Sequence, residues 1–208
     1  MMDISIVIPA FNEAHKIRYD VEAAASFISD AGFQGEVIIV DDGSTDGTAE
    51  AARKADIPSS VGFTVLRLEK NSGKGFAVKT GIKETKADVV LFADSGTCIP
   101  YSNALPVIER IRAGELDIAL ASRRHKDSII RRKRSLKRQL LSLLFHRAAV
   151  WITGLPRRIT DSQCGFKVYR GEIARKLFAE CLTRGYMFEL ETLLRALELG
   201  YRIEEFPV

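Results

Sequence analysis

Residues 37–48 read Val-Ile-Ile-Val-Asp-Asp-Gly-Ser-Thr-Asp-Gly-Thr and decide the fold class. A run of β-branched apolar residues is typical of a strand that is buried on both faces, as in a parallel sheet. The run ends at Asp41 and Asp42, so the strand should deliver two carboxylates to its carboxyl end, where small molecules bind in open α/β sheets. The alternative is an ordinary strand-to-helix turn in which Ser44 or Asp46 caps the helix.

Two further apolar runs end in polar residues in the same way. Residues 5–9 lead into Ala10-Phe11-Asn12-Glu13, and residues 88–93 lead into Asp94-Ser95-Gly96. Polar side chains at these positions can form hydrogen bonds or bind metal at the ends of the strands. The first strand carries no Gly-x-Gly-x-x-Gly motif, which argues against a dinucleotide-binding fold of the nicotinamide type.

Helical patterns separate the strands. Residues 17–31 place their apolar side chains on one face, with Gly32 as a C-cap, and residues 76–86 form a second pattern after a glycine-rich turn. Alternating strands and helices predict an α/β fold with a mixed, mostly parallel sheet flanked by helices. At 208 residues the chain can bury one good core, so we expect a single domain spanning residues 1–208.

Cysteine use and the first residues bear on the cellular compartment. The three cysteines show no Cys-x-x-Cys spacing, so neither a zinc site nor a disulfide framework is expected. This favours a reducing compartment. The first residues lead directly into a strand and leave no room for a signal peptide. These features predict a cytoplasmic protein, peripheral at a membrane if its basic segment binds lipid.

Positive charge is concentrated in that basic segment. Residues 123–138 contain nine Lys or Arg residues and one acid, whereas the whole chain has a net charge of +4. The apolar stretch 136–155 is too short and too charged to span a bilayer, but segment 123–155 suits a surface that lies on anionic lipid. A solvated basic loop before an amphipathic core helix is an equal alternative. Nucleic acid is not expected as a partner, because no aromatic residues interleave the cations.

Several motifs, taken together and in order, resemble those of family 2 glycosyltransferases. They are Ile-Val-Ile-Pro-Ala-Phe-Asn-Glu (6–13), Val-Asp-Asp-Gly-Ser-Thr-Asp-Gly-Thr (40–48), Asn-Ser-Gly-Lys-Gly (71–75), Asp94 and Asp-Ser-Gln-Cys-Gly-Phe-Lys (161–167). Together with Ser122-Arg123, Arg134-Ser135 and Arg138, they make the chain most similar to polyprenyl-phosphate sugar transferases, the dolichyl-phosphate glucosyl- and mannosyltransferases. The resemblance implies a GT-A fold, a nucleotide-sugar donor, a lipid-phosphate acceptor and inversion at the anomeric carbon.

The resemblance also implies a nucleotide-sugar-binding site. Its residues would be Pro9, Ala10, Phe11, Asn12, Glu13, Asp41, Asp42, Gly43, Lys74 and Asp94. Asp42 would accept a hydrogen bond from the base, residues 9–13 would wrap the base and ribose, and Lys74 would steady the donor. The motif at 161–167 favours UDP-glucose, with a mannose donor as the second choice.

An acceptor site is implied as well. Arg123, Arg134 and Arg138 present forked hydrogen-bond donors suited to a phosphate, and with Asp161 they form the implied catalytic set. The acceptor phosphate is already an anion, so Asp161 would position the acceptor or an arginine as much as remove a proton. The alternative is that Asp161 is an N-cap, or a buried acid paired with a nearby arginine.

The sequence departs from the family pattern at the metal site. The family usually carries Asp-x-Asp, whereas this chain has Asp94-Ser95-Gly96. Because Mg²⁺ commonly takes one or two carboxylates plus substrate phosphates, Asp94 is expected to hold Mg²⁺ or Mn²⁺ weakly and together with the donor. Cys98 is no substitute for the missing carboxylate, since a thiolate is a soft ligand.

Two other functional classes stay open. A nucleotide-sugar-binding protein without turnover would share the motifs at the strand ends, and the missing second aspartate favours it. A family 2 enzyme for soluble or polysaccharide acceptors would need a catalytic carboxylate. Glu189 or Glu191 is available for that role, although both are more simply interpreted as the polar face of a helix whose leucines face inward.

Overall fold

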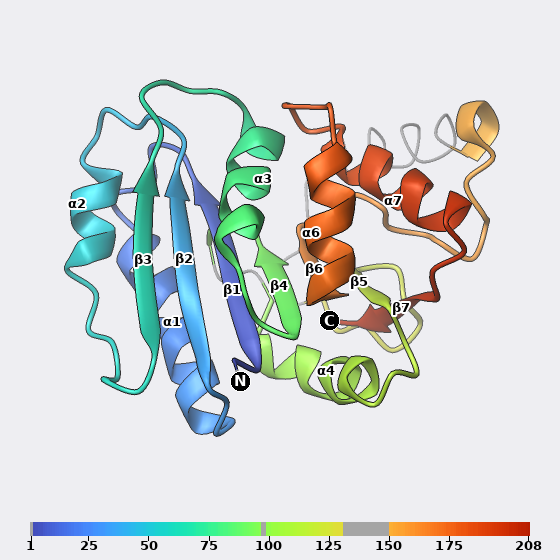
Figure 1. Ribbon diagram of the computed structural model, residues 1–208, viewed down its shortest axis with the longest axis horizontal. Helices are drawn as coiled ribbons and strands as arrows, with labels where there is room; N and C mark the ends of the chain where they lie inside the picture. Colours follow the sequence, from blue (N-terminus) through green and yellow to red (C-terminus); the bar gives the residue numbers. More distant parts are fainter. Residues whose placement is uncertain (1, 97–98, 131–149) are drawn as a thin grey trace.

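The computed structural model describes residues 2–96, 99–130 and 150–208. These residues form a seven-stranded sheet in the order β3-β2-β1-β4-β6-β5-β7 (Figure 1). The strands are β1 (Ile4–Ala10), β2 (Gly35–Asp41), β3 (Gly62–Arg67), β4 (Val89–Ala93), β5 (Ile118–Ser122), β6 (Phe166–Arg170) and β7 (Ile203–Pro207). In this described sheet only β6 runs antiparallel to its neighbours, so the predicted mixed, mostly parallel sheet is confirmed.

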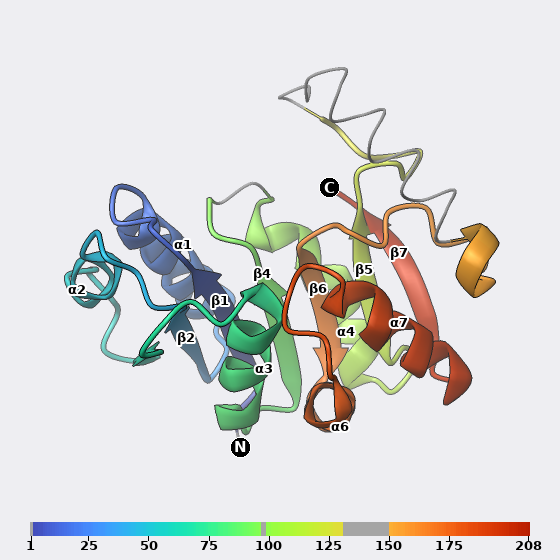
Figure 2. The same cartoon turned by 90° about the horizontal axis from the view of Figure 1, so that it is seen from above.

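Helices cover both faces of the sheet. They are α1 (Ile17–Asp30), α2 (Thr48–Arg53), α3 (Lys74–Glu84), the 3-10 turn η1 (Tyr101–Ala104), α4 (Leu105–Arg112), α6 (Gly171–Glu180) and α7 (Phe188–Glu198). Residues of α1, α2 and α4 pack into the core on one face, and α3, α6 and α7 pack on the other. Figure 2 looks along the sheet and shows α1 on one side and α3, α6 and α7 on the other.

The central strands form where the sequence predicts buried strands. All seven residues of β1 are buried, and Ile6 lies opposite Val37 of β2 on one side and Leu91 of β4 on the other. β-branched side chains favour such a pleated, fully covered position. Helix α1 ends one residue before the expected range, and α3 begins at Lys74, two residues earlier than the apolar pattern predicts.

The direction of β6 determines what meets at the functional edge of the sheet. The six parallel strands bring their carboxyl ends to this edge, and the antiparallel β6 brings its amino end there. The segment that precedes β6, residues 161–167, therefore reaches the same edge as Asp42 and Asp94. Within the described ranges, every helix falls short of the length and apolarity that a bilayer-spanning segment needs.

Candidate functional site

Loops after β1 and β2 interlock through hydrogen bonds to the backbone. The Asn12 N–H donates to Ser44 Oγ at 2.9 Å, and the Glu13 N–H donates to Thr48 Oγ1 at 2.8 Å. Asp46 accepts the Thr48 N–H at 3.0 Å, but Gly47 is the N-cap of α2 and makes no side-chain cap, so the interpretation in which Ser44 or Asp46 is the cap is wrong. Asn12 has a φ of 55°, a left-handed conformation that Asn tolerates better than most residues. The two loops form one rigid rim.

Asp42 is buried, with 3% of its surface exposed, and both of its carboxylate oxygens are engaged. Oδ1 accepts the Ser72 N–H at 2.7 Å and Oδ2 accepts the Gly73 N–H at 2.9 Å. These bonds hold the turn that leads into α3 and places Lys74. A contact between Asp42 and a nucleotide base stays a prediction, whereas its role in the turn is visible directly.

The other predicted donor residues lie on the same rim. Pro9 and Ala10 end β1. Asp41 is buried and accepts the Ser44 N–H at 2.9 Å, and Gly43 packs against the backbone of Lys70 and Asn71. Phe11 is 45% exposed. The exposed ring of Phe11 is therefore the apolar surface that this rim offers to a ligand. The structure brings the predicted donor residues together at one edge of the sheet.

A cluster of four charged side chains lies beside this rim. Lys74 Nζ is 2.7 Å from Asp94 Oδ1 and 3.0 Å from Glu189 Oε1. Lys167 Nζ donates to the other oxygen of Glu189 and to the Cys164 carbonyl. Glu189 and Lys167 are almost completely buried, with exposed side-chain fractions of 3% and 1%. We call Lys74, Asp94, Lys167 and Glu189 the charge cluster.

Burial and pairing oppose each other in the pKa values of the charge cluster. Burial favours the neutral form of Lys74, but the carboxylates of Glu189 and Asp94 outweigh it and raise the Lys74 pKa above its usual value. Burial alone would raise the pKa of Glu189, yet the ammonium groups of Lys167 and Lys74 hold it below its usual value. Lys74 and Glu189 are therefore charged at neutral pH.

Glu189 corrects one interpretation of the sequence. The helical pattern placed Glu189 and Glu191 together on a solvated polar face, which is wrong for Glu189 because the residue is buried against Lys167. Leu190 and Leu193 do face inward, as predicted. The available signal was Lys167, a lysine between Phe166 and Val168 in the sequence, since a lysine that is buried in a strand needs a buried acid as its partner.

The 161–167 segment connects the charge cluster to a second ion pair. The Gly165 carbonyl accepts the Asp94 N–H at 2.7 Å, and a Cβ on Gly165 would come within 2.0 Å of Asp94 Oδ2. Only glycine allows this approach. At the other end of the segment, the Gln163 carbonyl accepts a hydrogen bond from Arg123 at 3.3 Å. One short segment thus places Asp94 and Arg123 at the same edge.

Arg123 and Asp161 form a bidentate pair. Asp161 accepts Nε of Arg123 at 2.5 Å and Nη2 at 2.6 Å, and it also accepts the Arg123 N–H at 3.1 Å. Glu205 of β7 supports Asp161, because its carboxylate accepts the N–H groups of Thr160 and Asp161 at 2.7 and 2.8 Å. The paired-acid interpretation of Asp161 is therefore confirmed. Glu205 is a supporting residue that the sequence motifs did not indicate.

Other predicted residues fall on the segment 131–149. Arg134 and Arg138 lie outside the described residues, as does most of the apolar stretch 136–155. The described residues on either side of segment 131–149 include exposed apolar side chains. Ile129 is 77% exposed on one flank, and Trp151 and Ile152 are 87% and 72% exposed on the other.

The described residues do not form a ready divalent-metal site. In the part of the chain that the structure describes, no three His, Cys, Asp or Glu side chains gather as potential ligands. Gly96, at the position of the second aspartate, has a φ of 114°, a conformation that strains any L side chain. The Lys74 ammonium contacts Asp94 directly. The donor set therefore does not fit the expected Mg²⁺ or Mn²⁺.

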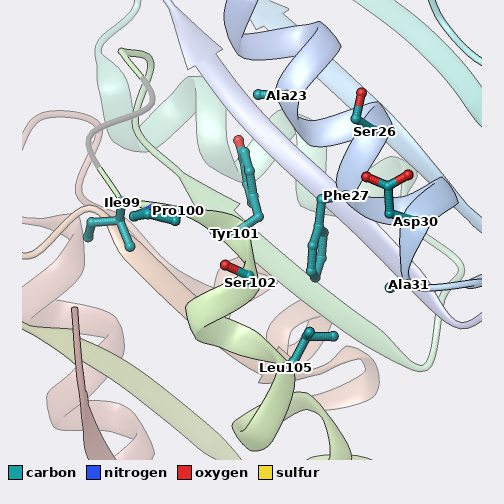
Figure 3. A pocket seen from close by; sticks show the side chains of 10 residues that line it. All are labelled: Ala23, Ser26, Phe27, Asp30, Ala31, Ile99, Pro100, Tyr101, Ser102 and Leu105. Carbon is teal, nitrogen blue, oxygen red and sulfur yellow. The ribbon is translucent and has the colours of Figure 1, made fainter.

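A shallow pocket elsewhere has a different character (Figure 3). It lies between α1 and the segment that contains η1, and its lining includes Phe27 and Tyr101, whose rings stack 5.8 Å apart. None of the predicted site residues lines it. The pocket is thus separate from the predicted site residues at the sheet edge.

Comparison with known proteins supports the assignment of the motifs. The family model described as Glycosyl transferase family 2 matches residues 5–178. A dolichyl-phosphate beta-glucosyltransferase of Saccharomyces cerevisiae is 33% identical over 99% of this chain and 66% of the relative. The protein of the same name from Homo sapiens is 31% identical over 99% of this chain and 66% of the relative. The chain thus spans about two thirds of the length of these curated relatives.

Solved structures show the same fold. Glucosyl-3-phosphoglycerate synthase from Mycobacterium tuberculosis, crystallised with Mn²⁺, UDP-glucose and phosphoglyceric acid, superposes with a TM-score of 0.70. The match has 22% sequence identity and covers 99% of this chain and 69% of that one. The expected GT-A fold is confirmed by this likeness and by the sheet order. With its motifs, its sheet and the matched family model in agreement, the chain belongs to glycosyl transferase family 2.

Proposed function

We propose that this chain catalyses the transfer of glucose from UDP-glucose to a polyprenyl or dolichyl phosphate. The observation that carries the proposal is the 161–167 segment, which joins the Arg123–Asp161 pair to Asp94 at the sheet edge. The Arg123 guanidinium, whose Nε and Nη2 groups are held by Asp161 and Gln163, then lies on the same edge as the donor rim. The identity to dolichyl-phosphate beta-glucosyltransferases supports the choice of glucose and of a lipid phosphate.

The donor would lie along the rim between the β1 and β2 loops and the charge cluster. Phe11 would contact the base or ribose, and Lys74 would face the diphosphate. The structural relative that was crystallised with UDP-glucose supports a uridine nucleotide. Asp42 would act chiefly by holding the turn before Lys74, since both of its oxygens already accept hydrogen bonds.

The acceptor phosphate would bind at Arg123, completed by Arg134 and Arg138. A phosphate oxygen attacks the anomeric carbon and forms the new C–O bond, while the bond from that carbon to the UDP oxygen breaks and UDP leaves with the electron pair. The attacking oxygen already carries a negative charge, so no strong general base is required. Asp161 is fully engaged with Arg123 and would orient its guanidinium.

Glu189 and Glu191 offer little support for a soluble or polysaccharide acceptor. That function would need a carboxylate that is available to remove a proton. Glu189 is paired with Lys167 and Lys74, and Glu191 accepts the N–H groups of Leu182 and Thr183 at 2.9 and 2.8 Å. Neither acid offers an available base.

The proposal also places the protein at an anionic membrane surface. Ile129, Trp151 and Ile152 would insert between lipid headgroups, and the cations of segment 123–138 would attract the lipid charge. Replacing Arg131, Arg132 and Lys133 by Gln should weaken binding to phosphatidylserine vesicles by roughly 1 kcal/mol per charge. Vesicle flotation that is indifferent to salt and to lipid charge would contradict this part.

Product formation tests the function directly. The chain is incubated with UDP-glucose or GDP-mannose, and with polyprenyl phosphate or a simple sugar as acceptor. Lipid-linked glucose as the main product is the expected result. A glycosylated soluble sugar would favour the other acceptor class, and donor binding without any product would favour a binding protein without turnover. Lipid-linked mannose as the main product would correct the donor.

A further inference from the structure

The charge cluster already contains a cation, the Lys74 ammonium, in contact with Asp94, the acid that the sequence motif assigns to a metal ion. Lys74 Nζ lies between Asp94 Oδ1 and Glu189 Oε1, at 2.7 and 3.0 Å. Two carboxylates therefore face each other across an ammonium group. Glu189 supplies the second carboxylate in space, although it lies far along the chain from the missing aspartate.

The remaining oxygens of the two carboxylates differ in their surroundings. The second oxygen of Glu189 accepts a hydrogen bond from Lys167. Asp94 Oδ2 lies directly against Gly165. A divalent ion would have to displace Lys74 to bind Asp94 and Glu189 together, and Gly96 provides no further ligand. The geometry thus suits an ammonium group better than an octahedral ion that keeps several waters.

The charges of the cluster also favour an ammonium group over a divalent ion. The cluster has two basic side chains, Lys74 and Lys167, and two acidic ones, Asp94 and Glu189, and burial raises the pKa of Asp94 above its usual value. Adding a divalent ion would leave a partly buried cluster with excess positive charge, which is unfavourable until an anion arrives. A diphosphate, by contrast, can approach Lys74 from the side of Asp94, whose side chain is 43% exposed.

Aromatic rings hold the ammonium group in this position. Lys74 Nζ lies 5.2 Å from the ring centroid of Phe92 and 5.6 Å from that of Phe188. Both distances fall within the range of cation–π interactions, which strengthen where water is excluded. The ammonium group is thus preorganised before any ligand binds.

We propose that Lys74 supplies the positive charge for the donor diphosphate, and that the donor site works without a divalent metal ion. This inference rests on the proposed function. When the bond between the anomeric carbon and the diphosphate oxygen breaks, UDP leaves with the electron pair and its added negative charge faces the Lys74 ammonium. No proton moves in this step, and Glu189 acts as a positioning residue for Lys74.

Calorimetry of UDP binding tests the proposal on the unaltered chain. We expect the UDP dissociation constant measured in EDTA to agree within about twofold with the constant measured in excess Mg²⁺ or Mn²⁺. This difference is well below a tenfold change in the dissociation constant, which corresponds to about 1.4 kcal/mol. UDP affinity that appears only with added metal would overturn the inference. Absence of UDP binding under every condition would instead overturn the proposed function.

Variants of Lys74 test whether its ammonium group contributes to UDP binding in the absence of metal. Lys74→Met should weaken UDP binding in EDTA by about tenfold or more, because a charge-assisted contact is lost, whereas Lys74→Arg should retain most of it. Lys79→Met is the matched control, since Lys79 lies on the same helix and, among the described residues, donates to the carbonyls of Ala179 and Cys181 and to no acid of the charge cluster. Equal UDP affinity in Lys74→Met and the unaltered chain would overturn the role of Lys74.

A metal-binding measurement provides a readout that is independent of the nucleotide. Removing the ammonium leaves Asp94 and Glu189 facing each other, so Lys74→Met should bind Mn²⁺ detectably by electron paramagnetic resonance while the unaltered chain does not. Tight Mn²⁺ binding by the unaltered chain would contradict the inference. If Lys74→Met does not fold, the EDTA comparison on the unaltered chain and on Lys74→Arg still decides the question.

Discussion

The two ends of the functional edge are held together in different ways. At the β1–β2 end, side-chain oxygens accept hydrogen bonds from backbone N–H groups, as Asp42 does from Ser72 and Gly73. At the β4–β6 end, charged side chains pair with other charged side chains, as Lys167 does with Glu189. The first end is built from turns, and the second from ion pairs.

This difference has an energetic consequence. Removing an acid that accepts backbone N–H groups leaves those groups unsatisfied, at a cost of about 1–3 kcal/mol. Removing one partner of a buried ion pair leaves an uncompensated charge, at a cost of about 3–5 kcal/mol. The β4–β6 end should therefore be the more sensitive of the two to single substitutions.

The largest expected effect is the loss of Lys167. Lys167→Met should lower the free energy of unfolding by about 3–5 kcal/mol, because the buried Glu189 loses one of its two lysine partners and keeps only Lys74. Urea unfolding measures the change. The exposed Lys176→Met is the control and should change stability by less than about 0.5 kcal/mol. The double variant with Glu189→Met should recover much of the loss, and a failure to recover would show that the pair is not the cause.

The next effect concerns activity at the Arg123–Asp161 pair. Arg123→Gln should lower transfer to polyprenyl phosphate by about 10²–10³-fold, as loss of a preorganised charged donor typically does. UDP affinity, measured by calorimetry, should not change. Arg112→Gln is the control, since Arg112 pairs with Asp3 at the opposite edge of the sheet. Full transfer activity in Arg123→Gln would remove Arg123 from the acceptor site.

A smaller effect is expected at the β1–β2 end. Asp42→Ala should lower the free energy of unfolding by about 1–3 kcal/mol in the absence of any ligand, because the Ser72 and Gly73 N–H groups lose their acceptor. Amide hydrogen exchange at these two residues should accelerate. The exposed Asp56→Ala is the control. If Asp42→Ala changes only UDP affinity and not stability, Asp42 contacts the nucleotide instead of holding the turn.

The smallest effect is a dependence of stability on pH at Glu191. Burial opposes ionisation, but hydrogen bonds from Thr183 and Leu182 lower the pKa of Glu191 from 4.5 to about 2. The stabilisation is therefore fully present above pH 4.5 and is lost as the pH falls towards 2. Urea unfolding at several pH values should show this loss, and Glu191→Gln should reduce it while the exposed Glu198→Gln should not. An unchanged slope in Glu191→Gln would contradict the assignment.

Sequence patterns were most informative where the structure is local. Residues 37–48 predict a buried strand and a turn with two carboxylates, and the structure has both there. The helix over residues 17–31 was likewise predicted, because an apolar face repeats with helical period and Gly32 follows it. The start of α3 was less predictable, since the bonds to Asp42 that shape this turn come from a distant strand.

The α/β class, the motifs at the strand ends and the resemblance to family 2 glycosyltransferases can all be predicted from the amino-acid sequence. Each of these depends on residue types within a few positions of one another. The folded chain was needed to find that Glu189 is buried, that Lys74 lies between Asp94 and Glu189, and that Glu205 supports Asp161. The physical reason is that a side-chain ion pair depends on distance in space, and β6 brings these residues together only once the sheet has formed.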